Sequence, residues 1–282
     1  MTTLSAQTRV WFITGAARGI GLRIVEAALA AGDAVVATSR DARSLRERFA
    51  GNDALLPVAL DVTDEKQAAA AVAAALDRFG RIDVLVNNAG YGVVGALEET
   101  PDAELRALMD TNFFGALAVT RAALPVLREQ RGGAIVNMSS LGGQLSFAGF
   151  GAYAATKFAL EGASEALAQE VAPFGIKVLI VEPGQFRTQL AGAGMRHMPE
   201  LAAYAATVGG TRAFAHDMHQ TQAGDPRKAA AAIERALAAP VTPLRLQLGG
   251  DAVDAVRAHA QALLADLDAW EAVGRGTDFD AR

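Results

Sequence analysis

The chain has 282 residues, no cysteine and a formal net charge of −5, and 51% of its residues are hydrophobic. This composition supports a buried core, excludes disulfides and thiol chemistry, and argues against a nucleic-acid interface, which needs a basic stripe. The first residues lack the features of a signal peptide, and no apolar run approaches the ~20 residues of a membrane span. We expect a soluble, cytoplasmic protein whose partners include neither nucleic acid nor membrane.

Short apolar segments alternate with longer segments of helical periodicity. The predicted strands cover residues 9–14, 34–39, 54–60, 82–87, 134–138, 176–181 and 244–248, and the predicted helices cover 20–31, 64–79, 101–130, 153–172 and 226–238. Strands that are apolar throughout are typical of a parallel sheet buried on both faces. We predict one α/β domain over residues 1–282, a Rossmann-like doubly wound parallel sheet of about seven strands with helices on both faces.

A glycine-rich turn joins the first predicted strand to the first helix. Gly15 permits the tight turn, Gly19 lets the backbone approach a pyrophosphate, and Gly21 allows the helix to pack closely on the sheet. The helix beginning near Ile20 directs free N–H groups at the phosphates. The spacing GxxxGxG differs from the GxGxxG fingerprint, and an ordinary strand-to-helix turn is the alternative. We predict a dinucleotide site.

The end of the second strand indicates which dinucleotide binds. An acidic residue there would hold the ribose hydroxyls of NAD, but Ser39 occupies the position, and Arg40 follows. Arg40 and Arg18, within the glycine loop, suit a 2′-phosphate. Asp41 sits two positions late and is expected to cap a helix from Ala42. We predict NADP(H), with NAD(H) possible.

Two further strand ends offer contacts to the adenosine. Asp61, followed by Val62, ends the third strand and could accept from the adenine amino group, or cap the next helix, or both. Asn88, Ala89 and Gly90 end the fourth strand, where small residues let the backbone pass under the ribose, although a plain turn has the same signature.

Three residues predict proton transfer to a carbonyl or from a hydroxyl. Tyr153 and Lys157 lie one turn apart on a predicted helix. A nearby ammonium lowers the pKa of a tyrosine from its usual ~10, which makes Tyr153 a general acid or base. Ser140, at the end of the fifth strand, would hold and polarise the substrate oxygen. Each feature alone has an ordinary structural explanation; their coincidence favours catalysis.

Taken in order, these motifs resemble those of the short-chain dehydrogenase/reductase family, of the single-domain type. The matching segments are TGAARGIG at 14–21, NNAG at 87–90, Asn112, Ser140, YAATK at 153–157 and Pro183-Gly184. The resemblance implies a sheet order of 3-2-1-4-5-6-7. It also implies a fourth catalytic residue, Asn112, which kinks its helix and holds a water that connects to the lysine. It places Pro183, Gly184, Phe186 and Thr188 around the nicotinamide.

The expected function is therefore an NADP(H)-dependent oxidoreductase that interconverts a carbonyl and a secondary alcohol, with Tyr153 as acid or base. The alternative from another class is an NADP-binding regulatory or sensor protein without turnover; the complete set Asn112, Ser140, Tyr153 and Lys157 disfavours it. A sugar-nucleotide epimerase or dehydratase is also disfavoured, because those relatives have TGxxGxxG and a larger C-terminal domain. No histidine–carboxylate pattern predicts a metal site.

Two late segments fall outside the alternation. Residues 185–224 contain Phe186, Leu190, Met195, Met198, Leu201, Tyr204 and Phe214, which indicate either an apolar substrate lid or the core of two small helices. Residues 251–270 carry apolar side chains at helical spacing. This extra C-terminal helix could cover the surface that shorter family members use to form tetramers. We expect a small, apolar carbonyl or alcohol substrate and a homo-oligomer, with a dimer favoured.

Overall fold

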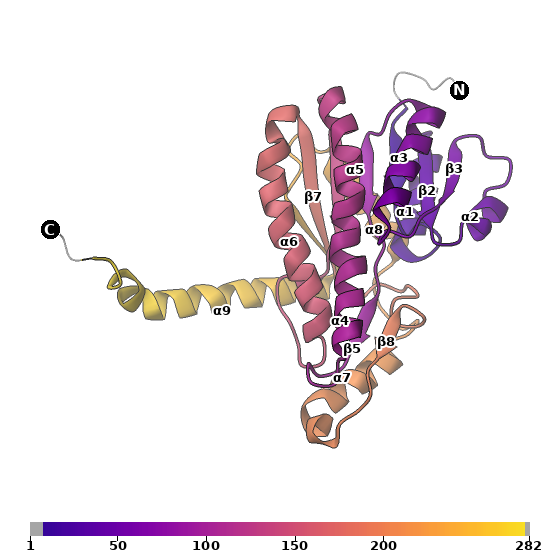
Figure 1. Ribbon diagram of the computed structural model, residues 1–282. Coiled ribbons are helices and arrows are strands. Elements are labelled where there is room, and N and C mark those ends of the chain that lie inside the picture. The colour runs from indigo at the N-terminus through magenta and orange to yellow at the C-terminus, as the bar shows by residue number, and fades with distance from the viewer. Residues whose placement is uncertain (1–7, 280–282) are drawn as a thin grey trace.

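The computed structural model describes residues 8–279 of the chain as a parallel sheet between two layers of helices (Figure 1). The strands are β1 Val10–Ile13, β2 Ala34–Ser39, β3 Leu55–Ala59, β4 Val84–Asn87, β5 Gly92–Val94, β6 Gly133–Met138, β7 Ile176–Pro183, β8 Met195–His197 and β9 Arg245–Leu248. The α-helices are α1 Gly19–Ala30, α2 Arg43–Arg48, α3 Glu65–Phe79, α4 Asp102–Met109, α5 Gly115–Gln130, α6 Gly151–Val171, α7 Ala205–Asp217, α8 Pro226–Ala238 and α9 Gly250–Arg275.

The main sheet has seven strands in the order β3-β2-β1-β4-β6-β7-β9, and every pairing within it is parallel. The short strands β5 and β8 pair separately from it. With these two left out of the count, the order is 3-2-1-4-5-6-7, so the prediction is confirmed. The order reverses between β1 and β4, which creates the crevice in which such folds bind ligands.

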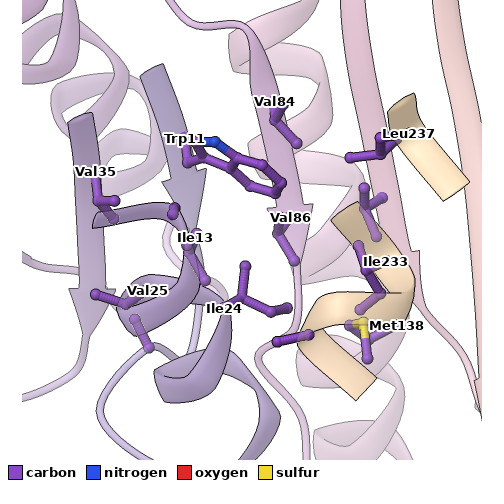
Figure 2. Packing of buried hydrophobic residues seen from close by; sticks show 14 of the residues in the cluster. Trp11, Ile13, Ile24, Val25, Val35, Val84, Val86, Met138, Ile233 and Leu237 are labelled. Carbon is purple, nitrogen blue, oxygen red and sulfur yellow. The ribbon is translucent and has the colours of Figure 1, made fainter. Parts of the chain in front are cut away.

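Alternation along β1 explains why helices cover both faces of the sheet. Trp11 and Ile13 join one buried cluster with residues of α1 and α8, and Figure 2 shows this packing. Val10 and Phe12 join the opposite cluster, with residues of α3, α5 and α6. Successive side chains of a strand point to opposite faces, so a strand that is apolar throughout requires two covering layers.

The predicted helix over 101–130 is interrupted. A π-helical segment, η1 Asp110–Phe114, lies between α4 and α5. Such insertions are found mostly as single turns inside α-helices, frequently at functional sites. The buried side chain of Asn112 sits within η1, in agreement with the kink that the family resemblance implies.

The segment 185–224 forms one α-helix, α7, together with the 3-10 turn η4 Ala202–Tyr204 and strand β8. A buried ion pair anchors it: Arg212 on α7 lies 2.5 Å from Glu99, and also donates to the carbonyl of Met198 at 2.8 Å. The segment is therefore tied to the body of the protein next to β5.

The extra C-terminal helix is longer than predicted and lies elsewhere than expected. Helix α9 runs over 26 residues and extends away from the rest of the chain (Figure 1). Of its residues only Ala252 is buried, and every residue from 260 to 279 is exposed. The expectation that it covers a surface of its own subunit is therefore wrong for the part from residue 260 onward, because the apolar side chains of that part face solvent.

Candidate active site

Hydrogen bonds of Asn88, the residue that follows β4, hold the glycine loop in its conformation. The Asn88 side-chain amide donates to the carbonyls of Thr14 and Gly15 at 2.9 and 3.0 Å, and its backbone N–H donates to the Thr14 hydroxyl at 2.9 Å. Gly15 and Gly19 have φ angles of +62° and +59°, a region that side chains other than glycine rarely adopt. At these two positions the loop therefore presents backbone instead of side chains to the space above it.

Helix α1 begins directly after this loop and leaves its first N–H groups available. Its N-cap, Arg18, makes no side-chain cap bond, and its first turn holds no acidic residue. Unpaired N–H groups and the helix dipole favour an anion at such an end. The N-terminus of α1 is thus suited to a pyrophosphate.

The end of β2 presents cations instead of a free carboxylate. Ser39 donates its hydroxyl hydrogen to the carbonyl of Asp41 at 2.6 Å. The Asp41 carboxylate is bound by Arg43 at 2.6 Å, and this side-chain hydrogen bond lowers the pKa of Asp41 to about 2. Arg18 and Arg40 are exposed, and within residues 8–279 neither forms an ion pair. Helix α2 begins at Arg43, one residue later than expected, and the N-cap position is that of Ala42.

Asp61 and Val62, the predicted adenosine-binding residues after β3, both contact other residues of the chain. Asp61 accepts from the backbone N–H and the hydroxyl of Thr63 at 3.0 and 2.7 Å. The expected alternative, that Asp61 caps the next helix, is wrong: Asp64 caps α3 by accepting from Lys66 and Gln67. Val62 is buried close to Gly115.

Ser140, Tyr153 and Lys157 come together at the carboxyl ends of β6 and β7. Ser140 is the N-cap of the 3-10 turn η2 Leu141–Gly143, and its hydroxyl oxygen accepts from the Gly142 N–H at 3.1 Å. The Ser140 side chain lies beside the Tyr153 hydroxyl and favours its ionised form. The Lys157 ammonium lies 5.7 Å from the centre of the Tyr153 ring and donates to the Met138 carbonyl at 2.8 Å.

Burial dominates the electrostatics of this trio. Burial raises the pKa of Tyr153, and the Ser140 side chain works in the opposite direction. Burial also lowers the pKa of Lys157 to about 8, opposed by the charge of Glu161. The predicted lowering of the Tyr153 pKa by the ammonium is therefore wrong, because desolvation of the phenolate is the larger effect.

Asn112 lies behind this trio. Its amide oxygen accepts from the Tyr91 N–H at 3.1 Å, and its amide nitrogen donates to the Tyr91 carbonyl at 2.9 Å and the Thr156 hydroxyl at 3.2 Å. A Cβ on Gly90 would lie 3.0 Å from the Asn112 oxygen and 3.9 Å from the Lys157 nitrogen. The glycine at this position therefore keeps open the space between Asn112 and Lys157.

One pocket gathers most of the predicted site. The predicted residues that line it are Gly15, Arg18, Gly19, Ile20, Asn88, Gly90, Ser140, Tyr153, Lys157, Pro183, Gly184, Phe186 and Thr188. Those outside its lining are Gly21, Ser39, Arg40, Asp61, Val62, Ala89 and Asn112. Gly21 packs against Asn88 beneath the loop. Ser39 and Arg40 lie at the end of β2, and Asp61 and Val62 lie just after β3. Met138, Ser139, Gln189 and Gly194 also line the pocket and were not predicted to bind the cofactor.

A second cavity, of about 530 Å³, adjoins the first at Ser140 and Tyr153. Its wall is mostly apolar, and four residues of the predicted lid contribute to it: Phe186, Leu190, Met195 and Phe214. The other three do not line it. Met198 belongs to a buried cluster with Val93 and Leu108, Leu201 is exposed, and the Tyr204 hydroxyl donates to Glu98. The lid and the core interpretations of this segment thus each describe part of it.

Asp251 is a lining residue that sequence reasoning missed. It stands in the first turn of α9, and its carboxylate accepts from the Gln185 N–H at 2.7 Å. A methyl group on Gly184 would overlap this carboxylate. The signal was available: an acidic residue three positions after the end of the last strand stands at the same sheet edge as the other site residues.

A buried acidic cluster lies behind α6, and sequence reasoning did not predict it. Arg245 lies 3.0 Å from Glu161 and 3.2 Å from Glu182, and Gln144 donates to both carboxylates. Burial raises the pKa of Glu161 to about 7 and also raises that of Glu182. Because Glu161 is one helical turn beyond Lys157, its charge acts on the lysine.

Over residues 8–279, no helix combines the length and the hydropathy required to cross a bilayer. The same part of the chain contains no group of three or more His, Cys, Asp or Glu side chains arranged to hold a metal ion.

Comparison with known proteins defines the family. Residues 9–196 match the family model described as short chain dehydrogenase, so the chain belongs to the short-chain dehydrogenase/reductase family of oxidoreductases. An oxidoreductase of Botryotinia fuckeliana is 42% identical over 269 residues, which cover 93% of this chain and 97% of the relative. The 3-ketodihydrosphingosine reductase of Bacteroides thetaiotaomicron is 43% identical over 182 residues, covering 64% and 65%.

A solved structure extends the similarity to almost the whole chain. The short-chain dehydrogenase from Streptomyces avermitilis is 53% identical and superposes with a TM-score of 0.92, covering 98% of this chain and 100% of that one. The Rossmann-like fold of the family is thereby shared, including the region beyond residue 196.

Proposed function

We propose that the protein is an NADP(H)-dependent oxidoreductase that interconverts a carbonyl and a secondary alcohol, with Tyr153 as the general acid or base. One observation carries this proposal: Ser140 and Tyr153 line both the pocket above the glycine loop and the adjoining apolar cavity. A substrate in the apolar cavity would reach the proton-transfer residues and a nicotinamide at the same point.

The residues present fit a dinucleotide. The loop at Gly15 and Gly19 presents backbone only, and the first N–H groups of α1 are available to a pyrophosphate. Pro183, Gly184 and Thr188 line the same pocket as Tyr153 and Lys157, and Thr188 also lies beside Gly19 of the loop. When bound, the nicotinamide would supply the hydride.

The preference for NADP(H) follows from charge at the end of β2. Arg18 and Arg40 are exposed cations, and Asp41 is held by Arg43. A 2′-phosphate would meet two guanidinium groups there and no free carboxylate. Related structures carry either cofactor: ElxO, 27% identical with a TM-score of 0.71, has NADP bound, whereas the 3-ketoacyl-(acyl-carrier-protein) reductase of Brucella melitensis, 30% identical, is complexed with NADH.

The side chains of the site have complementary tasks. Ser140 holds the substrate oxygen, and Tyr153 gives it a proton in the direction of reduction or takes one in the direction of oxidation. Lys157, with its pKa near 8, carries most of its positive charge at neutral pH and stabilises the phenolate that remains. The open space at Gly90 leaves room for a water between Lys157 and Asn112, through which the proton could be replaced.

The adjoining cavity favours an apolar substrate. Phe147, Phe150, Phe186 and Phe214 contribute to its wall, and its volume of about 530 Å³ is in the usual range for small-molecule sites. Its polar groups, which include Gln222 and Asp251, are few. We therefore propose an apolar ketone or secondary alcohol.

The test is a fluorescence titration of the purified protein with NADPH and NADH, followed by a panel of apolar carbonyls monitored at the nicotinamide absorbance. We expect tighter binding of NADPH and turnover of at least one ketone. Tyr153→Phe should bind NADPH as well as the wild type does and lose turnover by about 10²-fold or more. Turnover retained by this variant would refute Tyr153 as the proton donor, and tight binding without any turnover would favour a sensor.

A further inference from the structure

Helix α9 has two parts with different surroundings. At its base, Asp251 and Ala255 line the apolar cavity. Beyond His259, every described residue is exposed, including Leu263, Leu264, Leu267 and Trp270, whose side chains are 56–68% accessible. At about 1.5 Å per residue, the 26-residue helix is about 39 Å long, and it points away from the sheet (Figure 1).

The helix carries a heptad pattern. Successive steps of three and four residues connect half-buried Val253 and Val256, near its base, with the exposed positions Ala260, Leu263, Leu267 and Trp270. These five alternating steps of three and four residues are the spacing of a coiled-coil seam. A helix that covers its own subunit buries its apolar face there, whereas the distal part of α9 leaves its apolar face exposed.

A seam exposed to water requires a partner. Most of the stability of a helix in a protein comes from packing of its apolar face, and a contiguous exposed apolar patch marks an interaction surface. The helix carries five acidic residues and two arginines, which disfavours an anionic lipid surface. A second copy of the same helix offers the same heptad.

We propose that α9 pairs with α9 of a second copy of this chain in an antiparallel coiled coil, with Leu263 of each copy packed against Leu267 of the other. In this register the dimer has two equivalent contacts between Arg257 of one copy and Glu271 of the other, and one contact between the two Asp266 side chains. In a parallel register the dimer would have two contacts between Asp266 of one copy and Glu271 of the other, and Arg257 would contact no acidic side chain. Charge complementarity therefore favours the antiparallel arrangement.

The first test measures the molar mass of the full chain by sedimentation velocity. The wild type should dimerise at micromolar concentration, and Leu263→Glu with Leu267→Glu should raise the dissociation constant by about 100-fold or more, because two apolar contacts per copy become buried charges. The matched control, Ala258→Glu with Ala265→Glu, adds the same charge on the opposite face and should remain a dimer. A monomeric wild type, or a dimer that the seam variant leaves unchanged, would overturn the proposal.

Charge exchange tests the register. Arg257→Glu alone and Glu271→Arg alone should each weaken the dimer, and the double variant should restore it. A mixture of the two single variants should form heterodimers in preference to either homodimer. Asp266→Asn should tighten the dimer by removing the one like-charge contact. Equal weakening in the single and double variants would exclude this register.

Crosslinking provides a direct readout, because the natural chain contains no cysteine. A mixture of Leu263→Cys and Leu267→Cys chains should give a disulfide-linked heterodimer on mild oxidation. Each variant alone should crosslink poorly. Efficient crosslinking of Leu263→Cys with itself would instead show a parallel pair and overturn the antiparallel arrangement. The melting temperature of each variant serves as the control for folding.

Discussion

The side chain of Asn112 binds both backbone groups of Tyr91, accepting from its N–H at 3.1 Å and donating to its carbonyl at 2.9 Å. These two bonds join the π-helical segment η1 to the loop that follows β4. They therefore determine where the pocket wall at Gly90 and Tyr91 stands relative to Lys157.

Replacement of Asn112 by Ala should affect both stability and turnover. It leaves two backbone groups of Tyr91 without their partners, which should cost about 1–3 kcal/mol of unfolding free energy, and it should reduce kcat at saturating cofactor. Asn137→Ala is the matched control, because Asn137 is also buried and its amide binds Asn87 and Ser164 away from the pocket. The control should lose stability and keep its kcat per folded molecule; equal loss of kcat in both would reduce Asn112 to a structural role.

A methyl group at Gly21 should disrupt the glycine loop. It would overlap the Asn88 amide and lie 2.7 Å from the Gly15 carbonyl, so Asn88 would lose the bonds that hold the loop in its conformation. We expect Gly21→Ala to weaken NADPH binding by about tenfold or more. Gly162→Ala, in the open middle of α6, should stabilise the protein by about 0.5–1 kcal/mol. Fluorescence titration and thermal melting of the pair separate steric overlap from a general effect of glycine replacement.

Removal of the Arg40 side chain should change cofactor preference. If Arg40 binds the 2′-phosphate, Arg40→Ala should weaken NADPH by about 10- to 100-fold, because charge-assisted bonds are worth about 1.5–3 kcal/mol. Binding of NADH should change little. Arg128→Ala, an exposed arginine of α5, controls for net charge. Fluorescence titrations of each variant with NADPH and with NADH measure the two affinities. An equal loss of affinity for both cofactors would contradict the assignment of Arg40 to the 2′-phosphate.

The acidic cluster behind α6 should make stability depend on pH through Glu161. Its pKa in the folded protein, about 7, lies above the ordinary value of 4.5 because burial disfavours the carboxylate. A raised pKa means that the contribution to stability is fully present below about pH 4.5 and is lost as the pH rises through about 7.

Glu161→Gln removes this titration. The free energy of unfolding of the variant, relative to the wild type, should therefore rise by about 1–3 kcal/mol between pH 4.5 and pH 8.5. Urea unfolding at the two pH values measures it. Glu165→Gln is the control, because Glu165 binds the same Arg245 at 2.7 Å but is exposed. If wild type and Glu161→Gln showed the same pH dependence, Glu161 would not be the titrating group.

The sequence by itself determined the fold and which strand ends carry the candidate binding and catalytic residues. Apolar segments such as β1 require cover on both faces, and the glycine loop, Ser140 and the Tyr153–Lys157 spacing are local patterns that one segment encodes. Because parallel strands bring their carboxyl ends to one edge, these local signals predict that the glycine loop, Ser140, Tyr153 and Lys157 line one pocket, whereas Pro183, Gly184, Phe186 and Thr188 were implied only by the resemblance to the family.

Only the tertiary structure decided what depends on segments far apart in the chain. The contact of Asp251 with Gln185, the cluster of Glu161, Glu182 and Arg245, and the rise in the Tyr153 pKa come from packing between distant elements. The direction of α9 belongs to the same class: its periodicity predicts a helix with an apolar face, but not where that face lies. Periodicity reports how residues of one element are related, whereas burial and charge pairing depend on which elements meet.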